Sequence, residues 1–235
     1  MIGIILASGR GSRMKNLTSK KPKTLLRYKN KIILEKIIEN FESNNIKNIY
    51  ITTGYKKNLF KNFDIKKIFN KNWNKTSIFE SLYCARNILK KNSCIISYSD
   101  IWYDIDAIKL LKNSKNQISI LSNNNWKKYW QKRFKNPLAD LESFKIDNRN
   151  FLKEIGKKEK NIKKIEGQFS GLFKINPNGW NKIEKFIKSD GLKKNFSKDI
   201  TNFFSSFIEK NPKTIKVVKF KSSWKEFDNK KDLKI

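Results

Sequence analysis

The sequence predicts an α/β fold with a mostly parallel β-sheet and helices on both faces. The first observation is the apolar run Ile2–Ala7, typical of a strand buried on both faces, which leads into a Gly- and Ser-rich segment at 8–13. The second is the alternation of strand-like and helix-like segments along residues 1–121. The connections between successive strands are long enough for helical crossovers, and such crossovers produce parallel neighbours.

Hydrophobic spacing predicts the elements in order. After the strand at 2–7, apolar residues recur at helical spacing over 33–41, and residues 49–54 form a second strand that ends in a turn. The same criteria predict further helices over 77–89, 105–111, 177–188 and 198–210, and further strands over 93–98, 117–121, 168–175, 215–220 and 224–228. Pro177 suits the first turn of its helix.

Residues 123–166 interrupt this alternation. Residues 123–140 are rich in Asn, Trp and Lys, and residues 142–146 and 151–155 alternate like the strands of a hairpin that turns at 147–150. We expect a small β-rich insertion that covers one end of the sheet. No internal repeat or flexible linker divides the chain, so we expect residues 1–235 to form one domain.

The composition excludes several classes of protein. The chain has no histidine, which excludes Ser-His-Asp triads, Cys-His dyads and His-ligated zinc. Cys84 and Cys94 are too few for a disulfide framework or a cysteine-type zinc site. No run approaches the roughly 20 apolar residues of a spanning helix, and no basic segment precedes an apolar one at the N-terminus. We therefore expect a cytoplasmic protein without a membrane partner.

The chain is strongly basic, with 53 Lys+Arg against 21 Asp+Glu and a formal net charge of +32. Nucleic-acid binding is the alternative that this charge raises, and a clustered basic patch would be expected for it. The lysines are instead scattered, and the abundance of Lys, Asn and Ile fits A/T-rich codon usage. We therefore expect no specific nucleic-acid partner.

The most informative motif follows the first strand. It consists of Leu6-Ala7-Ser8-Gly9-Arg10-Gly11-Ser12-Arg13-Met14, then Leu17-Thr18, then Lys21-Pro22-Lys23-Thr24-Leu25-Leu26. The two glycines let backbone N–H groups approach phosphate oxygens, Arg13 can fork onto a polyphosphate, and Lys23 supplies a movable point charge. The Gly-Lys-Ser/Thr ending of a Walker loop is absent, and Arg13 stands where a dinucleotide fingerprint needs a third glycine.

Taken whole, this motif resembles the signature of nucleotidyltransferases with the sugar-phosphate nucleotidylyltransferase fold, in which Ser8 replaces the usual second Ala. The resemblance implies a single Rossmann-like nucleotidyltransferase domain. It also implies that a nucleoside triphosphate contacts Leu6, Ala7, Ser8, Gly9, Gly11, Ser12, Arg13, Lys23, Thr76, Ser77, Ser81 and Ser99.

Further motifs resemble those of small bacterial cytidylyltransferases, a group whose members act on phosphocholine, aminoethylphosphonate or phosphoglutamine. The resemblance runs along nearly the whole chain, and its motifs are Asn72-Trp73-Asn74-Lys75-Thr76-Ser77, Ser97-Tyr98-Ser99-Asp100, Ile155-Gly156-Lys157, Gly167-Gln168-x-x-Gly171-Leu172 and Trp224-x-Glu226-Phe227-Asp228. This chain departs from the pattern of the group at Ser77, where many relatives carry Asn, and at Phe227, where relatives carry Ile. The implied reaction transfers CMP from CTP to a small phosphorylated or phosphonate acceptor and releases pyrophosphate. A sugar-1-phosphate nucleotidylyltransferase that uses UTP or dTTP is the alternative within the fold.

Two carboxylates are candidate ligands for a metal ion. Asp100 follows an apolar strand and therefore lies at the carboxyl end of the sheet, where open α/β folds bind ligands. The resemblance implies that Asp100 and Asp228 together hold Mg²⁺, which prefers hard oxygen ligands. It also implies that Arg13 holds the leaving pyrophosphate and that Lys23 holds the α-phosphate and the acceptor. A phosphate acceptor, with a second pKa of about 6, needs no protein base.

The acceptor is less constrained by the sequence. The resemblance assigns it to Tyr98, Trp126, Trp130, Arg133, Asp140, Glu142, Gln168 and Glu226. An aromatic wall would suit a quaternary ammonium through cation–π attraction, and its candidate members are Trp126, Trp130, Tyr98, Tyr103 and Trp73. Asp140 and Glu142 would instead pair with a primary ammonium, or serve to hold Arg133. A zwitterionic phospho- or phosphono-compound is favoured over a sugar phosphate.

Overall fold

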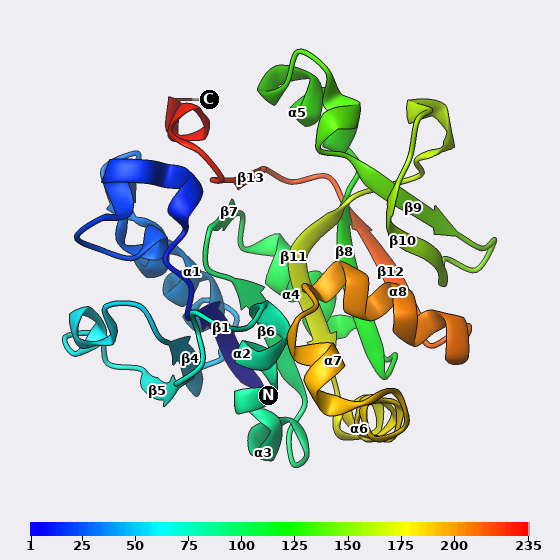
Figure 1. Ribbon diagram of the computed structural model, residues 1–235, viewed down its shortest axis with the longest axis horizontal. Helices are drawn as coiled ribbons and strands as arrows, with labels where there is room; N and C mark the ends of the chain where they lie inside the picture. Colours follow the sequence, from blue (N-terminus) through cyan, green and yellow to red (C-terminus); the bar gives the residue numbers. More distant parts are fainter. Residues whose placement is uncertain (235) are drawn as a thin grey trace.

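A seven-stranded sheet runs through the middle of the computed structural model, which describes residues 1–234 (Figure 1). The strand order is β12-β8-β11-β6-β1-β4-β5, with bounds β12 (Ile215–Phe220), β8 (Ile118–Asn123), β11 (Phe169–Ile175), β6 (Cys94–Tyr98), β1 (Ile2–Ala7), β4 (Ile49–Thr53) and β5 (Lys66–Phe69). β11 is antiparallel to both of its neighbours, and the remaining pairs are parallel. The mostly parallel sheet is therefore confirmed.

Helices cover both faces of this sheet. Their bounds are α1 (Ile33–Glu42), α2 (Ile78–Cys84), α3 (Arg86–Leu89), α4 (Asp106–Asn113), α5 (Trp126–Arg133), α6 (Pro177–Asp190), α7 (Leu192–Phe196) and α8 (Ile200–Lys210). In Figure 1, α2, α7 and α8 lie in front of the sheet, and α1 and α4 lie behind it. Asn176 and Asp199 cap α6 and α8, because their side chains accept hydrogen bonds from Gly179 N and Asn202 N.

Three elements differ from the expectation. The helix expected over 77–89 is interrupted at Ala85, whose backbone (φ −89°, ψ 9°) is not helical. The last strand, β13 (Trp224–Glu226), pairs outside the main sheet with a short strand, β7 (Ile101–Tyr103). Residues 126–133 form helix α5, in which Trp126 and Trp130 lie one turn apart and are both buried. The insertion therefore contains a helix as well as its hairpin.

The hairpin itself is confirmed as β9 (Glu142–Ile146) and β10 (Leu152–Lys158). Its turn is held by Asp147, whose Oδ1 accepts hydrogen bonds from the backbone N–H groups of Arg149 and Phe151. A second two-stranded unit, β2 (Arg27–Tyr28) and β3 (Lys31–Ile32), precedes α1. In Figure 1, α5 and the β9–β10 hairpin lie together beyond one end of the sheet.

Buried apolar side chains from the sheet, its helices and the hairpin form one continuous cluster. Phe144 of β9 and Phe173 of β11 both belong to it, so the insertion shares the core of the sheet. Within residues 1–234, no helix is long and apolar enough to cross a membrane.

Candidate active site

The Gly-rich loop turns sharply after β1 and fixes the position of Lys23. Gly11 has a φ of +73°, and a Cβ at this position would lie 2.7 Å from Lys23 Cε. Glycine is therefore required both by the backbone and by the lysine packed against it. Thr18 Oγ1 donates a hydrogen bond to Gly11 O at 3.0 Å, which closes the turn.

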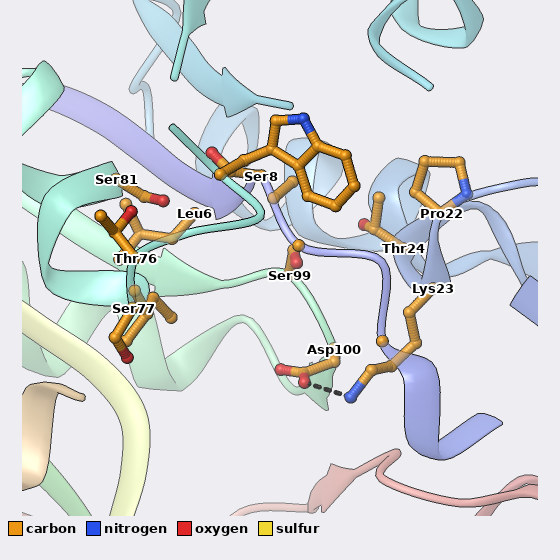
Figure 2. A pocket seen from close by; sticks show the side chains of 15 residues that line it. Leu6, Ser8, Pro22, Lys23, Thr24, Thr76, Ser77, Ser81, Ser99 and Asp100 are labelled. Carbon is orange, nitrogen blue, oxygen red and sulfur yellow. Dashed lines mark hydrogen bonds and ion pairs between the residues drawn. The ribbon is translucent and has the colours of Figure 1, made fainter. Parts of the chain in front are cut away.

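A cavity that we call the loop pocket opens between this loop, the start of α2 and the end of β6. It is lined by Leu6, Ala7, Ser8, Gly9, Gly11, Pro22, Lys23, Thr24, Trp73, Thr76, Ser77, Ile78, Ser81, Ser99 and Asp100. Figure 2 shows Lys23 reaching across the pocket to Asp100. The hydroxyls of Ser8 and Thr24 are buried without a hydrogen-bond partner among residues 1–234. Because buried polar groups are normally hydrogen-bonded, these hydroxyls indicate a polar ligand.

The residues predicted to contact the nucleotide converge on the loop pocket, with two exceptions. Ser12 is exposed at the start of a 3₁₀ turn and is not among the lining residues. Arg13 lines the neighbouring pocket described below. Two residues of the expected aromatic wall lie apart from the others. Trp73 lines the loop pocket, where its ring packs 5.5 Å from that of Tyr55, and Tyr103 is buried in the core.

The two candidate metal ligands lie close together although they are far apart in the chain. Pairing of β7 with β13 brings them together, and Phe227 N donates to Asp100 O at 2.9 Å. Lys23 Nζ lies 2.6 Å from Asp100 Oδ2 and 3.4 Å from Asp228 Oδ1. Arg13 also reaches Asp228 Oδ1, at 2.8 Å. Burial lowers the pKa of Lys23, but the two carboxylates outweigh this effect and raise it, so the lysine is a permanent cation.

The donor set at Asp100 and Asp228 fits Mg²⁺. Carboxylate oxygens are hard ligands, and Mg²⁺ is usually held by one or two carboxylates together with substrate phosphates. Residues 1–234 contain no cluster of three or more acidic, cysteine or histidine side chains that would form a complete protein cage. Lys23 Nζ, within 3.4 Å of both carboxylates, shows that this position already attracts a cation.

The Arg133 side chain is buried and lines neither the loop pocket nor the acidic pocket described below, which differs from its expected role in binding the acceptor. Its guanidinium is 0% exposed and donates to Glu226 Oε2 at 3.2 Å, to Asp228 Oδ2 at 3.2 Å and to Asp232 Oδ1 at 3.1 Å. The partners that hold it are therefore these three carboxylates, and not Asp140 or Glu142. Arg133 is a positioning residue that fixes one side of Asp228, while Lys23 and Arg13 bind the other side.

A second cavity, the acidic pocket, adjoins these carboxylates. It is lined by Arg13, Tyr98, Trp130, Asp140, Glu142, Gln168, Phe169, Ser170, Gly171, Asp199, Thr201, Trp224, Glu226 and Asp228. Six of the eight residues expected to bind the acceptor are in this set. Trp126 is not, because it is 8% exposed and packs into the core. Trp130 stacks on Trp224 with ring centroids 5.7 Å apart, so these two rings form one wall and not an enclosing cage.

Negative charge dominates the acidic pocket. Burial raises the pKa of Glu226, and the charges of Asp228 and Asp100 raise it further. Burial also raises the pKa of Glu142; a hydrogen bond from Thr201 opposes this effect, and the charges of Asp199 and Asp140 add to it. Asp199 and Thr201 are not predicted as site residues from the sequence, because Asp199 there carries only the signal of a helix N-cap.

Comparison with known proteins identifies relatives along the whole chain. The CTP:phosphoglutamine cytidylyltransferase of Campylobacter jejuni is 36% identical to this chain. The alignment covers all of this chain and 98% of that protein. The choline-phosphate cytidylyltransferase of Streptococcus pneumoniae is 33% identical over 41% of this chain and 43% of that protein.

Solved structures confirm the fold. The CTP:phosphocholine cytidylyltransferase of Streptococcus pneumoniae superposes with a TM-score of 0.72 at 20% identity, covering 99% of this chain and 96% of that one. The inositol-1-phosphate CTP transferase of T. maritima superposes with a TM-score of 0.74 at 16% identity, covering 98% and 90%. Residues 3–151, which carry the Gly-rich loop, Lys23 and Asp100, match the family described as the MobA-like NTP transferase domain. The chain therefore belongs to the MobA-like NTP transferase family.

Proposed function

We propose that this chain transfers CMP from CTP to a small phosphorylated acceptor of the phosphoglutamine type and releases pyrophosphate. Full-length similarity to a CTP:phosphoglutamine cytidylyltransferase supports the donor and the acceptor class. We also infer that residues 1–235 act as one domain, with the insertion at 123–166 contributing Trp130, Asp140 and Glu142 to the acceptor site.

One observation carries this proposal: two pockets meet at a single pair of carboxylates and a single lysine. Asp100 and Lys23 line the loop pocket, Asp228 and Arg13 line the acidic pocket, and Lys23 Nζ contacts both carboxylates. A nucleotide in the first pocket and an acceptor in the second would therefore meet at this junction. Positioning two anions that repel each other is the main task of a phosphoryl-type transfer.

The reaction proceeds without a protein base. An acceptor phosphate, with a second pKa of about 6, is already an anionic nucleophile near neutral pH. Its oxygen attacks the α-phosphorus of CTP in line, a new P–O bond forms, and the bond to the β-phosphate breaks as pyrophosphate leaves. Lys23 and Arg13 stabilise the negative charge that spreads over the transferring and leaving phosphates. Arg133 holds Asp228 in place during this displacement.

Asp100 and Asp228 would hold Mg²⁺ between them when the nucleotide is bound. The ion would supply a Lewis acid that neutralises charge on phosphate oxygens. Lys23, which contacts both carboxylates in this structure, would then bind the α-phosphate.

The test is pyrophosphate release in the presence of Mg²⁺, measured for CTP, UTP, dTTP, ATP and GTP against phosphoglutamine, phosphocholine, aminoethylphosphonate and glucose-1-phosphate. We expect turnover with CTP and phosphoglutamine, and loss of that turnover when EDTA removes the metal. Turnover confined to glucose-1-phosphate with UTP or dTTP would contradict the proposal in favour of a sugar nucleotidylyltransferase. Full activity in EDTA would contradict the metal dependence alone.

A further inference from the structure

Three carboxylates in the acidic pocket have no counterion. Arg13, Lys23 and Arg133 neutralise Asp228 and Glu226, but among residues 1–234 no lysine or arginine forms an ion pair with Asp140, Glu142 or Asp199. Unpaired charge in a partly buried site is costly, and a ligand of opposite charge removes the cost.

A buried amide beside these carboxylates also lacks a donor. Gln168 is only 7% exposed, and its Nε2 donates to the backbone oxygen of Glu142 at 2.7 Å. That hydrogen bond fixes the amide, so Oε1 is its free atom, and no donor among residues 1–234 reaches it. Trp130 Nε1, the indole donor at this wall, is already used by Asp140 Oδ2 at 2.9 Å. The part of the pocket next to Glu142, Asp199 and Gln168 therefore offers acceptor atoms, which suit a ligand group that brings hydrogen-bond donors.

We propose that this part of the acidic pocket binds a primary ammonium group of the acceptor, with Glu142 and Asp199 as counter-charges and Gln168 Oε1 as a further hydrogen-bond acceptor. The inference rests on the proposed function and assigns a specificity role to Asp199. A primary ammonium carries three N–H donors in addition to its charge, and so matches both the unpaired carboxylates and the free amide oxygen.

A quaternary ammonium fits the same pocket poorly. It has no N–H group, so it leaves Gln168 Oε1 without a donor and depends on aromatic faces. The pocket tryptophans stack against each other at an interplanar angle of 12°, and Tyr129 packs edge-on against both. Part of each aromatic face is therefore covered by a neighbouring ring, and the rings form one wall of the pocket without enclosing a ligand. The pocket should discriminate against trimethylated acceptors.

Asp199 allows the charge to be tested separately from the fold. Its Oδ1 accepts hydrogen bonds from Asn202 N at 2.7 Å and from Thr201 Oγ1 at 3.1 Å, and so caps α8. Asn is as good an N-cap as Asp, so Asp199→Asn removes the charge and keeps the cap. The matched control is Asp147→Asn in the β9–β10 turn, where Oδ1 likewise accepts two hydrogen bonds, both from backbone N–H groups.

The experiment measures kcat and KM by pyrophosphate release with CTP and Mg²⁺ for wild type, Asp199→Asn and Asp147→Asn. The acceptors are phosphoglutamine, phosphoethanolamine and phosphocholine, the last two differing only by three N-methyl groups. We expect wild type to prefer an acceptor with a primary ammonium. Asp199→Asn should raise the KM for that acceptor at least about tenfold, or about 1.4 kcal/mol. Its KM for CTP should not change, and Asp147→Asn should behave as wild type.

The outcomes separate the two proposals. Turnover in which phosphocholine is as good as both primary ammonium compounds would overturn the ammonium site and leave the cytidylyltransferase proposal standing. Equal KM values for Asp199→Asn and Asp147→Asn, with wild-type thermal stability in both, would overturn the role of Asp199. Turnover only with a sugar phosphate, or none with any acceptor in folded protein, would overturn the proposed function itself, and the ammonium site with it.

Discussion

Replacing Arg133 with methionine should unfold the protein at a markedly lower temperature. The guanidinium is fully buried and donates to Glu226, Asp228 and Asp232 at 3.1–3.2 Å, so the variant leaves these carboxylates without their shared counterion. Removing one partner of a buried ion pair costs about 3–5 kcal/mol. In a chain of this size each kcal/mol lowers Tm by about 2–4 °C, which gives an expected fall of about 6–20 °C.

Thermal unfolding followed by circular dichroism is the assay. Arg149→Met is the control, because Arg149 is exposed in the β9–β10 turn and a surface substitution usually changes stability by less than about 0.5 kcal/mol. A Tm for Arg133→Met within about 2 °C of the control would refute the reasoning. It would mean that the three carboxylates become neutral or solvated at little cost once the arginine is gone.

Three further predictions concern the loop, the first carboxylate and acid stability. Asp100→Asn should lower kcat in the pyrophosphate assay by at least about 10²-fold while the far-UV circular dichroism stays unchanged, and wild-type turnover would contradict this. Gly11→Ala should lower the free energy of unfolding in urea by about 1–2 kcal/mol, because residue 11 has a left-handed backbone conformation, which alanine adopts at a cost. It should also reduce kcat/KM, because the added Cβ would displace the Lys23 side chain; unchanged kinetics would show that the loop adapts. Burial raises the pKa of Asp190, but hydrogen bonds from Lys194 and Lys198 lower it more, to below 3.8. Its contribution is therefore present above about pH 4 and is lost as pH falls through the lowered pKa, so urea unfolding should separate wild type from Asp190→Asn at pH 6, and the difference should shrink as pH falls below about 4.

Much of the sheet is predictable because its strands are buried on both faces and carry long apolar runs. Residues 2–7 and 94–98 are examples, and Asp100 follows the second of them directly, so its place at the carboxyl end of the sheet is predictable too. The edge strand β5 is not, since Lys66-Lys67-Ile68-Phe69 is short, begins with two exposed lysines and has no buried residue. Likewise, the apolar spacing of 77–89 continues through Ala85, and spacing alone does not reveal a change of backbone angle.

The burial of Arg133 and its ion-pair partners cannot be predicted from the sequence. Arginines are mostly exposed, and nothing next to Arg133 in the chain predicts its burial. Its partners at 226, 228 and 232 lie 93 to 99 positions away and become neighbours only when β13 pairs with β7. That pairing also brings Trp224, Glu226 and Asp228 to the acidic pocket, while Asp199 and Thr201 reach it from the start of α8 and emerge as site residues only in the folded chain.

The pairing of β13 with β7 lies outside the main sheet, so the sheet can form without the residues that complete the candidate active site. Lys23 and Asp228 are 205 positions apart, so their contact closes a loop of most of the chain, and contacts of such separation are slow to form. During synthesis, residues 1–220 supply every strand of the seven-stranded sheet before residues 224–228 exist. An unfinished chain can therefore build its Gly-rich loop and the sheet that carries it, yet it has no second carboxylate with which to bring a nucleotide and an acceptor together.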